Sequence, residues 1–238
     1  ISALLFSTQG WCGNTSVDLR FGHNTRSDVN DSRIKVMHQA ENGFYFSVEA
    51  AQNHNDTFFG DTDRNNPDDK GLKECAQDIE TRWRFDLGNG FAVAPGMVTV
   101  FTSSNTHYRP FIQGWKSFGN GLNLSARYRY NTVNDSHSDR MLDSGEYTRR
   151  ESHQFDLWFA YNIGKFGMSY NPRFRWQDNV DQGTGDDTYW EHTVAFNYQL
   201  DDGWTPYVEL VSLDKTYITA GGDHENDYAV RLGLVKQL

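Results

Sequence analysis

The chain has 238 residues, a formal net charge of −10 and a mean hydropathy of −0.74. It contains no run of the roughly 18 to 20 apolar residues that a membrane-spanning helix needs, which excludes a helical membrane protein. The chain has fewer Leu, Ile and Val residues than a large soluble core needs, and it has 16 Phe, 12 Tyr and 7 Trp residues instead. This composition favours a sheet closed on itself, with aromatic residues at two membrane interfaces and water inside.

Apolar and polar residues alternate along successive segments, and each segment predicts a β-strand because neighbouring strand side chains point to opposite faces. In 122–131, the apolar parity carries Leu122, Leu124 and Ala126, while Arg127 and Arg129 share the polar parity. In chain order the predicted strands centre on 17–22, 33–39, 44–48, 78–87, 91–102, 107–118, 122–131, 155–161, 166–177, 190–198, 204–213 and 227–234. We therefore expect an all-β chain of about twelve antiparallel strands.

The connections between these segments alternate between short and long. Short turns rich in Gly and Asn follow the even-numbered strands at 42–43, 88–90, 119–121, 163–165 and 201–203. Longer polar loops follow most of the odd-numbered strands, and this asymmetry is typical of bacterial outer-membrane barrels, with their short periplasmic turns. A soluble up-and-down barrel would instead turn its apolar face inward.

The domain organisation follows from this pattern. The sequence predicts an up-and-down transmembrane antiparallel β-barrel at 15–238, which crosses the outer membrane of a Gram-negative bacterium many times. Residues 1–14 are interpreted as an N-terminal arm or the remnant of a signal segment. Within 91–102, Pro95 and Gly96 predict a bulge or a lipid-facing kink, because proline cannot donate to the strand ladder.

Charges are distributed unevenly between strands and loops. Acidic residues concentrate in the long loops, such as 56–74 and 178–187, whereas basic residues fall on the polar parity of the strands. In a membrane barrel the apolar parity faces lipid, so the polar parity faces the lumen. The candidate pore-lining, substrate-binding residues are Arg20, Arg33, Lys35, Arg82, Arg84, Arg109, Arg127, Arg129, Arg173, Arg175 and Arg231.

Three pairs of these arginines lie two residues apart on one strand: Arg82 and Arg84, Arg127 and Arg129, and Arg173 and Arg175. This spacing places two guanidinium groups on one face about 6 to 7 Å apart. Guanidinium binds carboxylate in a bidentate manner, so such a ladder suits an anionic oligosaccharide that moves from site to site in a narrow pore. The alternative is a set of structural salt bridges with acidic residues of the same parity: Asp18, Glu49, Asp78, Glu80, Asp86, Glu191 and Glu209.

Five segments carry a resemblance to a known family: Ala94-Pro-Gly-Met-Val98, 101–110, Ala126-Arg-Tyr-Arg-Tyr130, Gly203-Trp-Thr-Pro-Tyr-Val-Glu209 and Asn226-Asp-Tyr-Ala-Val-Arg-Leu-Gly233. In these segments the chain resembles the oligogalacturonate-specific porin (KdgM) family, which also includes an N-acetylneuraminic acid porin. The resemblance implies a monomeric outer-membrane channel that takes up acidic oligosaccharides, in particular oligogalacturonates from pectin, along lumen arginines. A porin for N-acetylneuraminic acid or another acidic sugar is the alternative.

Two other classes receive less support. A barrel hydrolase needs a nucleophile, a histidine and an orienting group brought together, whereas Ser152 and His153 are adjacent and point to opposite strand faces. An adhesin would leave the lumen arginines unexplained. We therefore predict no enzymatic activity and no catalytic residues, cofactor or nucleic-acid partner, and we expect outer-membrane lipid and lipopolysaccharide around the barrel.

Three smaller features complete the analysis. Cys12 and Cys75 fall at opposite ends of the predicted barrel, so we expect them not to be bridged unless the N-terminal arm lies elsewhere. The segment 61–65 lacks the Gly and Glu of a calcium loop, and no metal site is predicted. His38 and His192 fall on the lipid-facing parity, which indicates interfacial residues rather than metal ligands.

Overall fold

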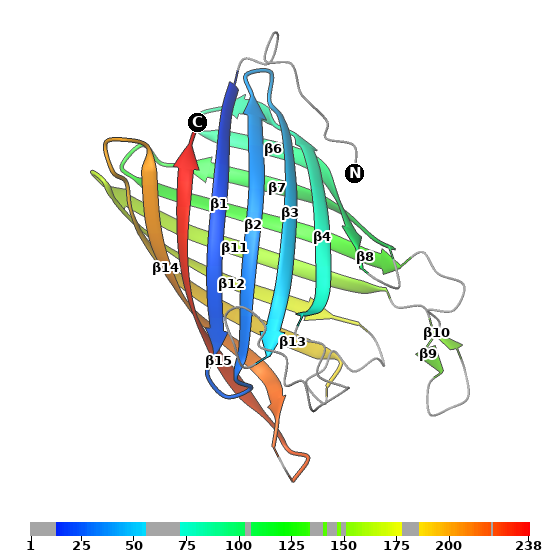
Figure 1. The fold of residues 1–238 in the computed structure, drawn as a ribbon. Helices are drawn as coiled ribbons and strands as arrows, with labels where there is room; N and C mark the ends of the chain where they lie inside the picture. Colours follow the sequence, from blue (N-terminus) through cyan, green and yellow to red (C-terminus); the bar gives the residue numbers. More distant parts are fainter. Residues whose placement is uncertain are drawn as a thin grey trace, which may run out of the picture.

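The computed structural model describes residues 13–55, 72–102, 106–133, 140–141, 147–148, 151–177, 186–219 and 221–238. Within these ranges the chain forms a closed antiparallel β-barrel of twelve strands (Figure 1). The all-β class, the up-and-down topology and the strand number predicted from the sequence are confirmed. The described residues contain no helix that is long and apolar enough to cross a membrane.

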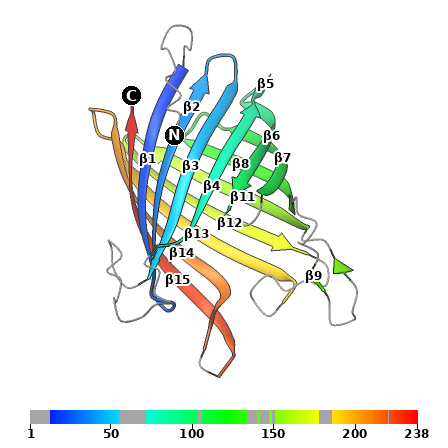
Figure 2. The same ribbon diagram turned by 45° about the vertical axis from the view of Figure 1, so that its right-hand side comes forward.

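The barrel strands are β1 (Gly13–Asn24), β2 (Val29–Ala40), β3 (Phe44–Asn55), β4 (Leu72–Trp83) with its continuation β5 (Phe85–Gly88), β6 (Phe91–Phe101), β7 (Thr106–Ser117), β8 (Leu122–Val133), β11 (Ser152–Ile163), β12 (Phe166–Trp176), β13 (Thr188–Tyr198), β14 (Trp204–Ile218) and β15 (His224–Gln237). β9 (Arg140–Met141) and β10 (Tyr147–Thr148) form a separate two-stranded sheet. β5 extends β4 toward the end of the barrel that carries the tight turns (Figure 2). The first strand begins two residues before the predicted boundary at Thr15.

Pairing between the first and last strands closes the sheet. Leu19 on β1 pairs with Leu234 on β15, and the same residue pairs with Ile34 on β2. All three side chains belong to the lipid-facing parity, and Leu19 and Ile34 are exposed in the isolated chain. Closure therefore satisfies the backbone of every paired strand while it keeps one apolar face outward, as a membrane barrel requires.

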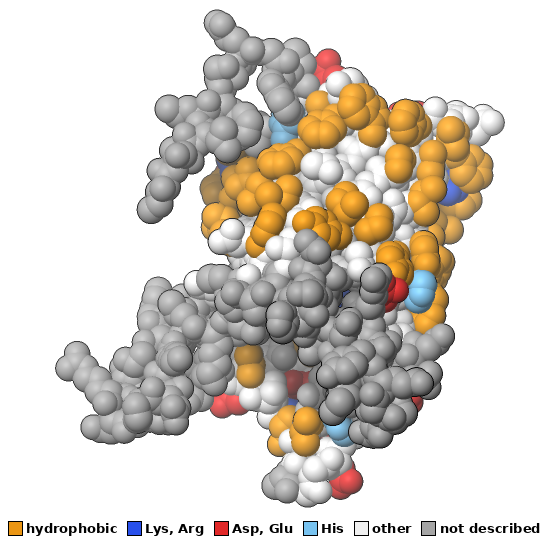
Figure 3. All heavy atoms as spheres, turned by 90° about the vertical axis from the view of Figure 1, so that its right-hand side faces the viewer, with side chains coloured by type: hydrophobic (Ala, Val, Ile, Leu, Met, Phe, Trp, Pro, Cys, Tyr) orange, Lys and Arg blue, Asp and Glu red, His pale blue; other side chains and the backbone are white. Residues whose placement is uncertain are grey.

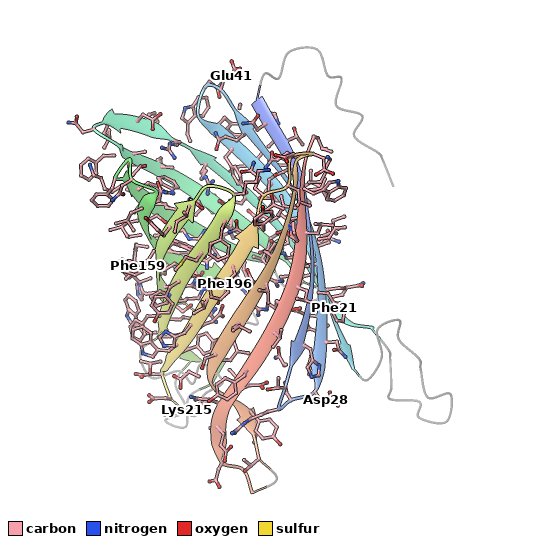
Figure 4. The ribbon with its side chains drawn as sticks, turned by 90° about the vertical axis from the view of Figure 1, so that its left-hand side faces the viewer. Phe21, Asp28, Glu41, Phe159, Phe196 and Lys215 are labelled. Carbon is pink, nitrogen blue, oxygen red and sulfur yellow. The ribbon has the colours of Figure 1, made fainter. Side chains whose placement is uncertain are left out.

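The two ends of the barrel differ in their connections. Figure 4 places Glu41, in a tight turn, at one end, and Asp28 and Lys215 at the other. Gly43 closes the first tight turn with a φ of 90°, and a Cβ there would lie 2.4 Å from the Arg84 carbonyl oxygen. The short turns share their end with the start of β1 and the end of β15, which identifies it as the periplasmic end.

The outer surface is apolar and aromatic. Figure 3 shows hydrophobic side chains gathered over the barrel wall on one side, and Phe21, Phe159 and Phe196 lie on the outside in Figure 4. His192 stacks on Trp190 and Tyr170, with ring centroids 5.7 Å and 6.1 Å away. The prediction that His192 is an outward-facing residue is therefore confirmed, and His38, which contacts Thr15 at 2.9 Å, shares that parity.

The irregularity predicted at Pro95 lies on the neighbouring strand instead. β6 runs without interruption, and Pro95 pairs with Ile112 on β7 in regular register. Across from it, β4 ends at Trp83, the position that faces Pro95 in this register, and β5 starts at Phe85. The ladder therefore breaks next to the residue that offers no N–H. The expected bulge in 91–102 was wrong because proline disturbed its partner rather than its own strand.

Two expectations concern residues outside the described ranges. The predicted lack of a bridge between Cys12 and Cys75 involves residue 12 and a side chain on β4 that the structure does not describe. The segment 61–65, considered as a calcium loop, also lies outside the described residues. Both remain predictions from the sequence.

Candidate functional site

The lumen holds a cavity of about 520 Å³ that most of the predicted basic residues line. Ten of the eleven candidate residues contribute to its wall, together with five carboxylate residues. The basic residues are Arg20, Arg33, Lys35, Arg82, Arg109, Arg127, Arg129, Arg173, Arg175 and Arg231, and the acidic ones are Glu49, Asp78, Glu80, Glu191 and Glu209. The alternation of side chains along each strand explains this convergence, because each residue occupies the inward parity.

One row of charges runs across four neighbouring strands. Arg127 on β8 pairs in register with Asp156 on β11, which pairs with Arg173 on β12, which in turn pairs with Glu191 on β13. Asp156 accepts hydrogen bonds from Arg127 at 3.1 Å and Arg173 at 2.8 Å, and Arg173 donates to Glu191 at 3.0 Å. Signs alternate along this neutral row, so it is a structural network of the kind that the alternative interpretation anticipated.

A second row lies one pleat closer to the extracellular end on the same strands. Here Arg129 pairs in register with Gln154, Gln154 with Arg175, and Arg175 with Tyr189. Among the described residues, Arg175 has no ion pair and Arg129 has one, with Asp156 at 3.9 Å. The Nε atoms of both arginines are buried without a hydrogen-bond partner. This row therefore carries two positive charges opposite neutral residues.

Arg109 on β7 adds a third guanidinium to this side of the lumen. It forms no ion pair with a described residue, and its Nε atom is buried without a hydrogen-bond partner. Asp78 is its main opposite charge, while Arg173 and Arg175 are near enough to repel it. A carboxylate in the lumen would therefore meet two guanidinium groups, those of Arg109 and Arg175, that have no ion pair with a described residue, beside Arg129, whose contact with Asp156 is 3.9 Å long.

The opposite wall is electrically balanced. Arg20 and Arg231 each lie 3.6 to 3.9 Å from Asp31 and Glu209, which gives two positive and two negative charges in one cluster.

Two further basic residues of this wall are also paired. Arg33 contacts Asp18, whose carboxylate also accepts a 2.8 Å hydrogen bond from Tyr207. Lys35 lies 3.3 Å from Glu49. The lumen thus has one compensated wall and one wall with excess positive charge.

Arginine and aromatic side chains stack at the periplasmic part of the lumen. The Arg82 guanidinium lies 3.9 Å from the centroid of the Tyr45 ring and 5.5 Å from that of Trp115. Arg84 lies 5.3 Å from the Trp115 ring and 3.0 Å from Asp86, and its side chain is 41% exposed. Arg84 is the one candidate residue that does not line the cavity, because the break between β4 and β5 interrupts the strand there.

Several important lumen residues were not singled out from the sequence. Asp156, which is completely buried, and Asp31 were overlooked as partners of the arginines. The alternation of Asp156 with Phe155 and Leu157 was the available signal. Ser152 and His153 do point to opposite faces: the serine accepts a 3.0 Å hydrogen bond from Asn131, and the histidine stacks on outer-surface aromatic rings.

A closed twelve-stranded barrel with an apolar outer face, short turns at one end and a charged lumen defines an outer-membrane porin. Comparison with known proteins shows which family of porins this chain belongs to. The family model of the oligogalacturonate-specific porin protein (KdgM) matches residues 8–234. The chain belongs to this family, as the sequence motifs predicted, and its location is the bacterial outer membrane.

Named relatives include two channels for different acidic sugars. The N-acetylneuraminic acid outer membrane channel protein NanC of Escherichia coli K12 is 26% identical over 239 residues, which covers 97% of this chain and 93% of NanC. The oligogalacturonate-specific porin KdgM of Dickeya dadantii is 25% identical over 199 residues, covering 82% of this chain and 81% of KdgM.

Solved structures show the same fold. The NanC porin superposes with a TM-score of 0.79 at 23% identity, covering 93% of this chain and all of that one. The KdgM porin gives a TM-score of 0.65 at 18% identity, covering 94% and 99%. The barrel architecture is therefore shared with both relatives.

Proposed function

We propose that this porin is an anion-selective channel through which acidic oligosaccharides diffuse passively into the periplasm. The observation that carries the proposal is the row of Arg129 and Arg175 on either side of Gln154, where the lumen holds positive charge without a carboxylate between them. A sugar carboxylate can bind there through charge-assisted hydrogen bonds and leave again, because the neighbouring guanidinium groups offer equivalent contacts.

The predicted substrates are oligogalacturonates. The charge rows are about 7 Å apart along the strand, so successive carboxylates of a uronate chain meet successive arginine levels. N-acetylneuraminic acid is the second candidate, supported by the extent of the similarity to NanC, which covers 97% of this chain. N-acetylneuraminic acid carries a single carboxylate, so one molecule would contact only one row of arginines at a time.

Recording from single channels in a planar bilayer tests both points. In a salt gradient we expect a reversal potential that indicates anion preference, followed by concentration-dependent block when trigalacturonate is added on the extracellular side. Cation preference would contradict the proposal. Stronger block by N-acetylneuraminic acid than by trigalacturonate would favour the second candidate. The same recordings test the expected monomer, because a monomeric barrel should open and close in single conductance steps.

A further inference from the structure

A lysine lies on the lipid-facing parity of β7 near the periplasmic end. Lys116 shares that parity with Ile112 and Gly114, and it pairs in register with Phe91 on β6 and Leu124 on β8. Ile112 and Phe91 are exposed outward in the isolated chain. An ammonium group on this face is unfavourable in hydrocarbon, so Lys116 must place its charge at the membrane interface.

The surroundings of Lys116 hold its ammonium group at that level. The Nζ atom donates a 2.5 Å hydrogen bond to the Asn89 carbonyl oxygen in the tight turn. It also lies 3.9 Å from the centroid of the Phe91 ring and 5.5 Å from that of Phe118. An ammonium group has three N–H donors, so donors remain for an anionic oxygen that arrives from the membrane.

An outer groove of about 600 Å³ begins at this lysine. The walls of the groove are apolar and are formed by Leu87, Phe91, Leu124 and Phe159. Its floor is formed by the small residues Gly114 and Ala126, which makes the groove deep. Phe159 points away from the barrel in Figure 4. A Cβ on Gly114 would meet only the Ala92 carbonyl oxygen, at 3.9 Å, so the space above this glycine is open.

We propose that this groove is a binding site for one glycerophospholipid of the periplasmic leaflet. An acyl chain lies along Gly114 and Ala126 between the apolar walls, and the lipid phosphate accepts hydrogen bonds from Lys116. Charge complementarity selects the occupant, because the groove is apolar along its length and positive at the interface, as a phosphate-bearing lipid requires. The site lies on the outside of the barrel and is independent of the lumen arginines.

Lys236 on β15 offers a matched control. It lies on the lipid-facing parity with Leu232 and Leu234, donates a 2.5 Å hydrogen bond to the Asp202 carbonyl oxygen and lies 5.0 Å from the Trp204 ring centroid. Its setting therefore reproduces that of Lys116, with a turn carbonyl and an aromatic ring. Lys236 is not among the residues that line the groove.

Native mass spectrometry of the purified, delipidated barrel measures the binding of added phosphatidylglycerol and of an uncharged diacylglycerol with the same chains. We expect Lys116→Gln to weaken phosphatidylglycerol binding about fivefold, the contribution of one interfacial lysine, and Lys236→Gln to change it less than about twofold. Gly114→Leu should weaken the binding of both lipids, because it fills the groove without backbone strain. Circular dichroism confirms that each variant is folded.

Two results would overturn the proposal. Equal losses of phosphatidylglycerol from the Lys116 and Lys236 variants would reduce the effect to general interfacial attraction. Unchanged binding of both lipids by Gly114→Leu would show that the groove does not hold the acyl chain.

Discussion

The side-chain amide of Gln154 donates a 2.8 Å hydrogen bond to Asp156, two residues further along β11, and both side chains are almost completely buried. The two residues occupy equivalent places in adjacent rows, each between two arginines on β8 and β12. Asp156 and Glu191 together neutralise their row, whereas Gln154 and Tyr189 leave the other row positive. The difference between a structural network and a candidate binding level is thus two carboxylates, of which Asp156 lies between the arginines.

Replacement of the glutamine by an acid should remove half of that difference. Gln154→Glu places a carboxylate between Arg129 and Arg175, and a charge pair at this separation contributes about 1 kcal/mol or more. We therefore expect the anion-to-cation permeability ratio, obtained from the reversal potential in a salt gradient, to fall about fivefold. Gln154→Met removes the hydrogen bond without adding charge and should leave the ratio unchanged. A similar fall in both variants would assign the effect to packing.

The arginines of the uncompensated row should carry the affinity for acidic sugars. Arg129→Gln combined with Arg175→Gln should weaken block by trigalacturonate about tenfold, because a charge-assisted contact contributes about 1.5 kcal/mol or more. Arg20→Gln with Arg231→Gln removes the same charge from the balanced wall, where Asp31 and Glu209 occupy the guanidinium groups. That control should weaken block less than about threefold. Equal effects would mean that only the total lumen charge matters.

The neutral row should matter for stability. Arg173→Gln removes one of the partners of Asp156 and the arginine partner of Glu191, and breaking a buried ion pair from one side costs about 3 kcal/mol. Urea unfolding in lipid vesicles measures the change in the free energy of unfolding. Arg175→Gln is the matched control on the same strand, and it should cost less than about 1 kcal/mol because no carboxylate of the described residues forms an ion pair with it. Equal losses would contradict the division into two rows.

The fold was predictable because the alternation of apolar and polar residues within each strand identifies its lipid-facing and lumen-facing sides. In 122–131 the parity of Leu124 and Tyr128 fixes the lipid face, and that of Arg127 and Arg129 fixes the lumen face, without knowledge of any other strand. Repetition of this pattern, with short turns after alternate strands, specified the barrel and the orientation of its ends. Pro95 deviated because the effect of a missing N–H falls on the strand across from it.

The site was only partly predictable. Parity shows that a side chain faces the lumen, but it does not show which side chain of another strand forms an ion pair with it. Arg127, Asp156, Arg173 and Glu191 come from four strands, and their alternation of sign depends on the register of three strand pairs. Neither the sequence of β8 nor that of β12 distinguishes Arg127 from Arg129 or Arg173 from Arg175. The neutral position of Gln154 between them becomes meaningful only when the strands are aligned.

The lumen also depends on a close contact between a glycine and an aromatic ring. A Cβ on Gly233 would lie 2.0 Å from the Tyr207 ring, whose hydroxyl group donates the 2.8 Å hydrogen bond to Asp18. Gly233→Ala should therefore push the ring away from Asp18 and lower the free energy of unfolding by about 1 to 3 kcal/mol. Among the described residues, loss of this contact also leaves Asp18 with Arg33 as its side-chain partner.

Urea unfolding of the vesicle-embedded barrel checks this, with Gly114→Ala as the control. The control position has open space and no positive φ, so alanine there should leave stability unchanged or raise it slightly by restricting the unfolded chain. Tyr207→Phe separates the hydrogen bond from the ring contact and should cost about 1 kcal/mol by itself. If Gly233→Ala were as stable as Gly114→Ala, the Tyr207 ring would have room to move, and the glycine would not be required for the position of Asp18.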